Sequence, residues 1–496
     1  MKKIISAIVI VTVVALFSSC KKSFLETVPP NNVTGENFYR NQADIKKAVS
    51  VVYAGLQPWD VDIYFYMSEV RSNNFTVVFS DAQRDWSDIS KFVAGPQTIA
   101  FRNVWRNGYQ IVNRANEVLA RIDGITFTDE NLKKQYKAEL RFLRAFSYFQ
   151  LVRLFNRVPL VDRVITPEEG IQIGQSEPAE IYAFITSEMN AVMNDLPPSY
   201  DQANLGRATK WAVKGILANV YMTMAGYPLN QKAKMNDAKP LLEEIMAQEG
   251  GAVKFHNNYK DMFTYVNDNK FFIFEVQYIS GGLGAGNQLP AQVYSEVSTS
   301  IATYRALIES TRLTITDDLI NSYDKEDLRF DATIDTNYLT NAVPAAYGNT
   351  PYFSKFMDPG LVLIDRNDWP INFPLLRYED VMLMYAEILN EQAGMPPPQA
   401  IALINRIRNR AGLQNINPAT KEDFNLAMLN ERRKEFAFEG QYWFYLVRSG
   451  QALKVMNDFF TATGQNIQID EHDLIYAIPE TEMNIYPGLY TQNPGY

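Results

Sequence analysis

The chain has 496 residues, of which 47% are hydrophobic, and it carries a formal net charge of −9. This composition is typical of a globular protein with a substantial core, and the length allows two or three domains. Acidic residues outnumber basic ones and the lysines and arginines form no basic stripe, which argues against nucleic acid as a partner.

Histidine and cysteine are nearly absent. The chain has two histidines, His256 and His472, and neither has the spacing of a metal site, so His-ligated zinc and Ser-His-Asp hydrolysis are disfavoured. We expect both histidines in loops or at the surface. The single cysteine, Cys20, excludes an intramolecular disulfide.

The N-terminus has the order of a secretory signal. Lys2 and Lys3 precede an apolar stretch over residues 4–17, and small residues lead to Cys20. The stretch is shorter than the roughly 20 apolar residues that span a bilayer. A cysteine at the cleavage point favours a lipoprotein, with a signal peptide over residues 1–19, lipid on Cys20 and a tether over residues 20–35. The alternative is an ordinary secreted protein with an incidental cysteine.

Helical periodicity dominates the rest of the chain. Pro178 and Pro197 bracket one helical segment in the way that helix boundaries favour. Apolar spacing predicts helices over residues 44–56, 98–122, 131–155, 177–196, 209–225, 239–247, 376–392, 398–411, 421–440 and 442–458. Residues 270–279 alternate apolar and polar positions and predict a strand. Two long segments, 57–96 and 280–370, follow neither period, and such insertions tend to carry function.

The helices come in pairs joined by Gly- and Pro-containing turns. Such pairs are typical of a tetratricopeptide-type solenoid, in which each hairpin buries a face on the next. We therefore expect a mainly α fold, a helical-hairpin scaffold with long irregular insertions and a few short strands. An N-terminal region, 36–269, and a C-terminal region, 270–496, are expected to pack as one body.

Three glutamates, Glu431, Glu435 and Glu439, lie four residues apart on one predicted helix face. Two carboxylates set across a sugar can form a glycosidase pair. Carboxylates on one helix beside arginines are better explained as scaffold ion pairs, for which Arg141, Arg144 and Arg153 are the expected partners.

Two other motifs resemble ligand sites, one for phosphate and one for calcium, but both are better interpreted as ordinary loops. The glycine-rich residues 281–286 do not open a helix, so we interpret them as a flexible loop and not as a phosphate site. The acidic residues around Arg329 offer oxygen ligands for calcium but lack EF-hand spacing, so a solvated loop is favoured. These residues are Asp324, Glu326, Asp327, Asp331 and Asp335.

Aromatic and amide side chains gather in the two insertions. A sugar ring is held by an aromatic plane under its C–H face and by polar side chains around its hydroxyl rim. On composition, the candidate ligand-binding residues are Trp59, Asn73, Asn74, Asp81, Trp86, Tyr278, Tyr347, Tyr352 and Trp369. For each of them, packing in the core is an equal alternative.

Stretches along nearly the whole chain carry a family resemblance. They are SFLE (23–26), RFLRAFSYFQLVR (141–153), ATKWA (208–212), NFPLLRYEDV (372–381), NRIR (405–408), ERRKEF (431–436) and QNPGY (492–496). With these motifs the chain resembles the SusD/RagB family of Bacteroidetes nutrient-uptake lipoproteins. It departs from the family where Lys21 and Lys22 follow Cys20 in place of an acidic pair.

The resemblance implies a tetratricopeptide-like scaffold and a non-catalytic role without cofactor or metal. It implies a lipid-anchored protein on the outer membrane, facing the exterior, that captures an oligosaccharide and delivers it to a SusC-like TonB-dependent transporter. Two alternatives stay open: a peptide-binding member of the same family, and a secreted hydrolase with a carboxylate pair.

Overall fold

The structure is a computed structural model that describes residues 39–77, 84–293, 313–335, 351–358, 361, 363, 365 and 367–496. Over these residues the chain is mainly helical, as predicted. The longer helices are α3 (Gln42–Ala54), η2 (Asp60–Glu69), α5 (Ile99–Ile122), α6 (Glu130–Phe155), α8 (Pro178–Val192), α9 (Lys210–Ala225), α10 (Met235–Met246), α14 (Tyr378–Ala393), α15 (Pro398–Arg410), α16 (Lys421–Glu435) and α18 (Ala452–Ala462). Shorter ones are α4 (Arg84–Ser90), α7 (Pro167–Gly170), η4 (Gln202–Asn204), α11 (Leu289–Val293), α12 (Asp317–Ile320), α13 (Phe330–Thr333), α17 (Tyr442–Arg448), η10 (Glu471–Leu474) and α19 (Glu480–Ile485).

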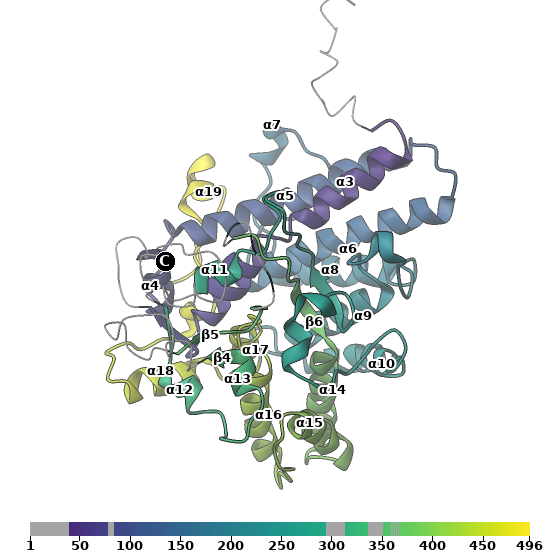
Figure 1. Cartoon of the computed structure of the whole chain (residues 1–496). Coiled ribbons are helices and arrows are strands. Elements are labelled where there is room, and N and C mark those ends of the chain that lie inside the picture. Colours follow the sequence, from purple (N-terminus) through teal and green to yellow (C-terminus); the bar gives the residue numbers. More distant parts are fainter. Residues whose placement is uncertain are drawn as a thin grey trace, which may run out of the picture.

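The longer helices pack in one continuous series. Helix α5 lies on α6, α6 on α8, α9 on α10, α10 on α14, and α14 on both α15 and α16. Figure 1 shows this series descending from α3, α5 and α6 through α9 and α10 to α14 and α15. The arrangement is the stacked-hairpin scaffold that the sequence predicts, in which each pair buries its apolar face on the next.

Local capping explains where these helices begin. The Asp129 carboxylate accepts from the Asn131 N–H at the start of α6, and the Thr209 hydroxyl accepts from the Ala212 N–H at the start of α9. Helix α16 begins with a capping box, in which Thr420 and Asp423 each accept from the other's backbone N–H. Such caps satisfy backbone donors that have no partner within the helix.

Short antiparallel strand pairs fasten the irregular segments to the helices. Strand β1 (Phe75–Val77) pairs with β3 (Leu313–Ile315), and β4 (Ile334–Asp335) pairs with β5 (Tyr352–Phe353). Strand β2 (Phe272–Val276) pairs with β6 (Phe373–Arg377), with Phe272 opposite Arg377 and Val276 opposite Phe373. The predicted strand over 270–279 is therefore confirmed, and its partner lies about a hundred residues later.

Several sequence predictions of element bounds are wrong, among them the start of α10 at Met235 and the end of α8 at Val192. Helix α16 ends at Glu435, so Glu439 lies in a turn and not on the predicted helix. The expected helix over 442–458 is two helices, α17 and α18, separated by Gly450, whose φ is +72°. Part of the expected irregular segment 57–96 is helical, because it contains the π-helix η2 and helix α4.

Cys20, the signal peptide and the tether lie outside the described residues. Among the described helices, none combines the length and the apolar composition that crossing a membrane requires.

Candidate functional site

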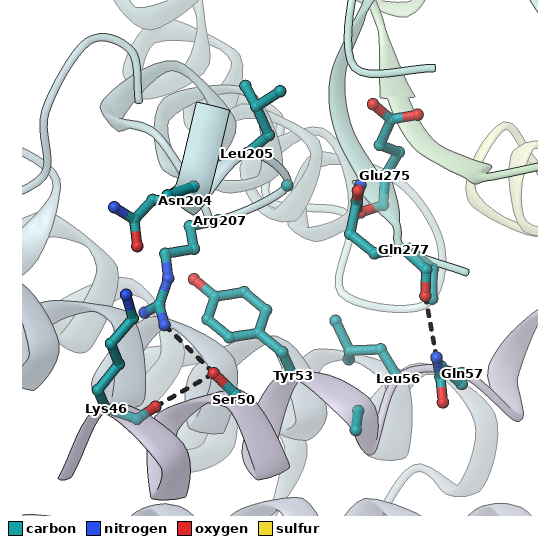
Figure 2. A pocket seen from close by; sticks show the side chains of 14 residues that line it. Lys46, Ser50, Tyr53, Leu56, Gln57, Asn204, Leu205, Arg207, Glu275 and Gln277 are labelled. Carbon is teal, nitrogen blue, oxygen red and sulfur yellow. Dashed lines mark hydrogen bonds between the residues drawn. The ribbon is translucent and has the colours of Figure 1, made fainter. Parts of the chain in front are cut away.

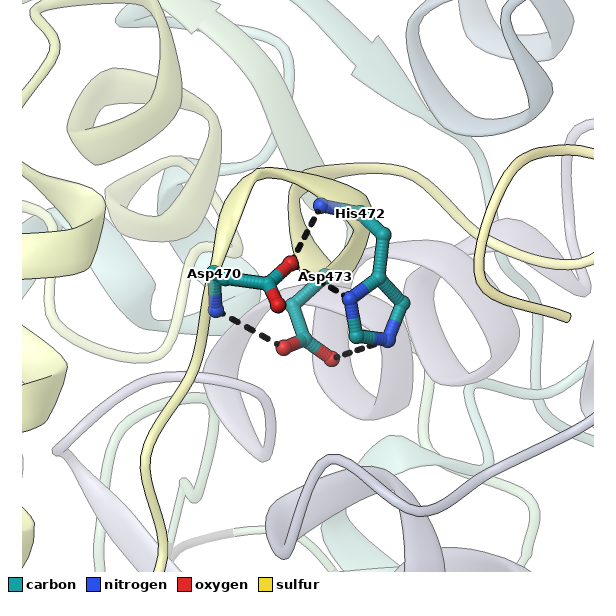
Figure 3. Close-up of side chains that lie close together, drawn as sticks. All are labelled: Asp470, His472 and Asp473. Carbon is teal, nitrogen blue, oxygen red and sulfur yellow. Dashed lines mark hydrogen bonds and ion pairs between the residues drawn. The ribbon is translucent and has the colours of Figure 1, made fainter.

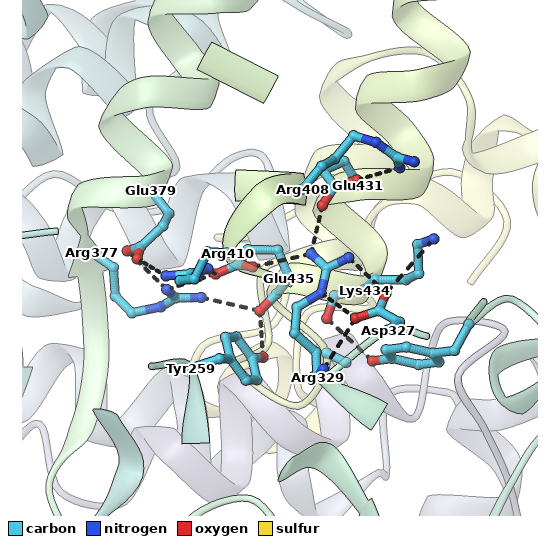
Figure 4. A network of polar contacts seen from close by, with 12 residues as sticks. Tyr259, Asp327, Arg329, Arg377, Glu379, Arg408, Arg410, Glu431, Lys434 and Glu435 are labelled. Carbon is cyan, nitrogen blue, oxygen red and sulfur yellow. Dashed lines mark hydrogen bonds and ion pairs between the residues drawn. The ribbon is translucent and has the colours of Figure 1, made fainter. Parts of the chain in front are cut away.

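A buried ion network, drawn in Figure 4, joins β6, α15 and α16. Glu435 on α16 binds Arg329 and Arg377, at 3.2 and 3.0 Å, and also binds Arg410. The neighbouring glutamates are paired as well: Glu431 Oε1 lies 2.6 Å from Arg329 Nη1, and Glu439 binds Arg377 and Lys355. Burial alone raises the pKa of Glu435, but the three arginines outweigh it and hold this pKa at about 2.

The network is scaffold, which confirms the structural interpretation of the three glutamates. Their side chains are at most 2% exposed, so none of them can reach a substrate. The expected partners were wrong, because α6 packs against α5 and α8. Arg141 and Arg144 bind Glu188, at 2.7 and 2.6 Å, and the Arg153 guanidinium lies over the Phe444 ring at 3.5 Å.

The two other motifs also take structural roles. Asp327 is buried, and its carboxylate binds Arg329 at 2.8 Å. The prediction of a solvated acidic loop is therefore wrong at this position. The glycine-rich segment is exposed at its tip, but the N–H groups of Gly281 and Gly282 donate to the Asp368 carboxylate at 2.7 and 3.0 Å. It is a tethered loop and opens no helix.

Among the described residues, one group of side chains has the spacing of a metal site (Figure 3). It consists of Asp470, His472 and Asp473. Each member already has a partner: Asp470 accepts from the His472 N–H, Asp473 accepts from the Asp470 N–H, and Asp473 also lies 3.6 Å from Arg71. These contacts cap the turn η10, so the group is accounted for without an ion. His472 and His256 are both partly exposed, as predicted.

Most of the candidate ligand-binding residues are packed inside the protein. Trp59 and Trp369 are each 1% exposed, and Trp59 packs on Phe146. Asn74 is fully buried. Its amide Nδ2 donates to the Glu69 carboxylate, and its Oδ1 accepts from Arg433 Nε. In this conformation these side chains offer a ligand no surface.

The remaining candidates divide into three kinds. Asn73 is buried and donates to Asp318 at 2.7 Å, and the buried Tyr278 hydroxyl donates to the Gln57 carbonyl at 2.6 Å. Asp81 and Tyr347 lie outside the described residues, and of Tyr352 only the backbone, in β5, is described. Trp86 is the one described candidate with a partly exposed side chain.

Trp86 forms a stacked aromatic platform with Tyr66. The two rings lie 4.6 Å apart with planes 19° from parallel, Trp86 on α4 and Tyr66 on η2. Tyr66 is 4% exposed and donates through its hydroxyl to Gln292 Oε1 on α11 at 3.3 Å. The buried tyrosine thereby fixes the orientation of the partly exposed indole.

Polar groups surround this platform. Burial raises the pKa of Asp62 to about 7, although Arg106 opposes this shift. Burial also raises the pKa of Tyr66 well above its usual value, and the charges of Asp62 and Asp60 add to the effect. The platform thus combines an aromatic plane with the Gln292 amide, and carboxyl groups of η2 lie close enough to act on the Tyr66 hydroxyl.

Two adjacent cavities, neither of them lined by Trp86 or Tyr66, lie on either side of the turn over residues 205–207. The first, in Figure 2, has a volume of about 290 Å³ and lies between α3, this turn and β2. The second, of about 310 Å³, shares the turn and Glu275 with it. Tyr53, Gln57, Arg207 and Gln277 line the first cavity, and Tyr200, Trp211 and Lys270 line the second.

The sequence missed Tyr66, Gln292 and the cavity residues. Tyr66 stood among the aromatic residues of the first insertion, but its pairing with Trp86 depends on the π-helix, for which a sequence offers no periodic signal. Glu275 was expected on a polar strand face, yet it is 4% exposed because β6 and the turn cover β2. That burial, more than the nearby Asp268, raises the pKa of Glu275 well above its usual value.

Two family models match the chain. Residues 243–496 match the model described as the SusD family, and residues 23–222 match one described as starch-binding, associating with the outer membrane. Among curated relatives, "SusD-like protein P25" of Formosa agariphila is 25% identical and covers 97% of both chains. "Starch-binding protein SusD" of Bacteroides thetaiotaomicron is 29% identical over 33% of this chain and 27% of its own.

Solved structures share the fold. A structure described as a laminarin-binding SusD-like protein superposes with a TM-score of 0.76 at 24% identity, over 92% of this chain and 100% of its own. A SusD homologue from Bacteroides thetaiotaomicron gives a TM-score of 0.79 at 21% identity, over 93% and 98% of the two chains.

Proposed function

The chain belongs to the SusD family, and from that premise we propose that it is a non-catalytic lipoprotein that captures an oligosaccharide. In this proposal Cys20 carries the lipid and the protein faces outward from the outer membrane. It delivers the bound sugar to a SusC-like TonB-dependent transporter. The observation that carries the proposal is the match of residues 23–222 to the model described as starch-binding and associating with the outer membrane.

Trp86 is the residue to which we assign the sugar contact. A pyranose presents an apolar C–H face, which an aromatic plane desolvates, and a hydroxyl rim, which needs hydrogen-bonding groups. The Trp86 indole is partly exposed and held by Tyr66, so little side-chain entropy is lost on binding. We assign the rim contacts to Gln292, which accepts from the Tyr66 hydroxyl, and to Asp62, which shares helix η2 with Tyr66.

The carboxylates considered for catalysis support a binding role. A glycosidase needs two carboxyl groups that face one another across an accessible bond. Glu431, Glu435 and Glu439 are buried and saturated by arginine and lysine side chains. They hold the scaffold together and are not available to a glycan.

The test is calorimetric titration of the mature chain, with Cys20→Ser, against neutral oligosaccharides and peptides, with product analysis of each mixture. We expect an oligosaccharide to bind without being cleaved. Trp86→Ala is expected to weaken that binding at least tenfold, about 1.4 kcal/mol, because the aromatic plane is lost. Tyr265→Ala, which removes an aromatic side chain that is 49% exposed elsewhere, is the matched control and should leave binding unchanged.

Each contrary result removes a specific part of the proposal. Binding of peptides alone would favour the peptide-binding alternative, and released products would restore the hydrolase alternative. For the anchor, we expect wild-type cells to incorporate labelled palmitate into the protein and Cys20→Ser cells not to. Labelling of the Cys20→Ser variant would contradict the assignment of Cys20.

A further inference from the structure

The two cavities beside the turn 205–207 differ from the rest of the molecule in charge. The chain as a whole is acidic, with a net charge of −9. The cavities, in contrast, are lined by four cationic side chains, Lys46, Arg207, Lys254 and Lys270, and by a single carboxyl group, Glu275. Burial raises the pKa of Glu275 well above its usual value, which disfavours the negative charge there.

Arg207 stands between the two cavities and is held rigidly. Its Nη1 donates to Glu139 Oε2 at 2.8 Å, and its guanidinium lies between the Tyr53 and Tyr136 rings, at 5.8 and 5.4 Å. The other terminal nitrogen, Nη2, donates a long bond, 3.3 Å, to the exposed Ser50 hydroxyl at the edge of the first cavity, its one hydrogen bond within the described ranges. A guanidinium fixed in this way has donors ready for a second oxygen acceptor.

The lysines supply the positive charge of the cavity mouths. In Figure 2 the Lys46 side chain extends toward the Arg207 guanidinium at one end of the first cavity. Lys254 and Lys270 are exposed at the second cavity. Within the described part of the chain, none of these three lysines has a carboxylate partner at ion-pair distance. Glu139 neutralises the charge of Arg207. The positive charges of the three lysines at the cavity mouths are therefore not neutralised by a paired carboxylate of the described residues.

The remaining lining residues suit a hydroxylated ring. Tyr53 and Leu56 supply apolar lining to the first cavity, Gln57 lies beside Leu56, and Asn204 and Gln277 supply further amides. The volume of about 290 Å³ is near the lower end of the range for small-molecule sites. Such a space accepts one sugar ring, and the charge favours a ring that carries an anionic group.

We propose that this pair of cavities is a second carbohydrate subsite, separate from the Trp86 platform, that takes an anionic sugar bearing a carboxylate or a sulfate ester. Arg207 and Lys46 bind the anionic group, and the amides of the first cavity bind the ring hydroxyls. The inference rests on the proposed function, since it names the class of oligosaccharide that the protein takes.

The test compares matched oligosaccharides on the mature chain with Cys20→Ser. A galacturonate trisaccharide, a sulfated galactose oligosaccharide and a neutral galactose trisaccharide are titrated by calorimetry at low and high salt. We expect at least one acidic oligosaccharide to bind more tightly than the neutral one and to lose affinity as salt rises, because screening weakens exposed charges. The two acidic ligands show whether a carboxylate or a sulfate is preferred.

Variants separate the subsite from the platform. Lys46→Gln with Lys270→Gln is expected to weaken the acidic oligosaccharide about tenfold, on the order of 1.4 kcal/mol for two charges. The matched control, Lys260→Gln with Lys325→Gln, removes two exposed charges elsewhere and is expected to leave the affinity unchanged. Trp86→Ala is expected to leave this charge-dependent binding in place.

Three outcomes would overturn the subsite. They are equal affinity for acidic and neutral oligosaccharides, unchanged affinity in Lys46→Gln with Lys270→Gln, and loss of the acidic ligand in Trp86→Ala. Each leaves the proposed function standing if a neutral oligosaccharide still binds through Trp86. Binding of peptides and of none of the three oligosaccharides would instead defeat the proposed function and the subsite together.

Discussion

Three carboxyl groups that are largely removed from water form no ion pair within the described part of the chain: Asp60 and Glu69 on the π-helix η2, and Asp268 just before β2. Asp60 is 1% exposed, and its Oδ1 accepts from the Val61 N–H at 2.7 Å. Burial raises the pKa of Asp60 to about 7, and it raises the pKa of Glu69 and of Asp268 to about the same value. These groups bind protons more tightly in the folded protein than in the unfolded chain, so they stabilise the fold at low pH and less as pH rises.

Asp60→Asn tests this linkage. In the wild type, each such carboxyl costs about 1.4 kcal/mol of unfolding free energy per pH unit between its unfolded pKa, near 4, and its folded pKa, near 7. The amide does not titrate, so we expect the variant to gain stability relative to the wild type as pH rises from 5 to 8. Urea unfolding at pH 5, 6.5 and 8 measures the difference.

A surface carboxylate provides the control for this experiment. Asp458→Asn changes a side chain that is 66% exposed and is expected to leave the pH dependence of the wild type intact. If the stability difference between Asp60→Asn and the wild type stayed constant across this range, the buried Asp60 would not titrate as described.

Single residues also show where sequence prediction ends. On composition, Trp59 and Trp86 were equal candidates for ligand binding, because both are tryptophans in a non-periodic segment. The structure buries Trp59 to 1% exposure and leaves Trp86 partly exposed on Tyr66. Burial depends on contacts such as Trp59 with Phe146, nearly ninety residues later, which local pattern does not encode.

At the scale of elements, the turn after α16 fits against η2 through Gly440. Its φ is +66°, and a Cβ there would lie 2.3 Å from Tyr64 Cβ and 2.4 Å from Tyr64 Cα. Gly450 has a similar φ of +72°, but nothing lies within 4 Å of its Cβ position. Both glycines therefore need a left-handed backbone, but only Gly440 also needs the absence of a side chain for close packing.

Alanine substitution at both positions makes this separation measurable. We expect Gly450→Ala to cost about 1 kcal/mol of stability, the usual cost of a left-handed backbone in a residue with a side chain. Gly440→Ala has the same backbone cost and also forces the turn away from Tyr64. We therefore expect it to lower the free energy of unfolding by more than about 3 kcal/mol. Denaturant unfolding measures both, and equal losses would show that the turn yields easily.

The ion network joins β6, α15 and α16, and its value to the fold can be tested at Arg377. This side chain is 1% exposed and binds Glu379, Glu435 and Glu439. Arg377→Met leaves buried carboxylates uncompensated, so we expect a loss of about 3–5 kcal/mol in the free energy of unfolding. Arg163→Met, at an ion pair whose arginine is 60% exposed, is expected to leave the free energy of unfolding nearly unchanged, because water screens the pair. Similar losses in the two variants would contradict the role of the network.

Elements with a strong period were predictable, and those shaped by tertiary contacts were not. Helices α5 and α6 lie within one residue of their predicted bounds, because their apolar spacing and caps are local. Helix α16 ends five residues early, where the turn over 436–440 packs on η2 and the Gly440 N–H donates to Glu69 Oε1 at 2.8 Å. The partners of Glu435 come from three separate elements, and no spacing rule brings them together.

At the scale of the whole molecule, contacts between distant segments connect the N-terminal and C-terminal regions. Helix α10 packs on α14, the buried Arg71 lies 3.6 Å from Asp473, and the buried Tyr259 hydroxyl donates to the Glu435 carbonyl at 2.7 Å. The family resemblance predicted the helical scaffold, which the comparisons confirm. The packing of regions 36–269 and 270–496 as one cooperative body stays a prediction, because contacts alone do not measure cooperativity.

Calorimetry of the mature chain with Cys20→Ser tests that cooperativity. Since the buried Arg71–Asp473 ion pair and the packing of α10 on α14 link both regions, partial unfolding of either would expose buried charges in the other, which costs several kcal/mol per ion. We therefore expect one thermal transition whose calorimetric and van't Hoff enthalpies agree, although proteins of this size often unfold in steps. Two separate transitions, or a folded fragment of residues 36–269 with native-like stability, would show that the regions are independent domains.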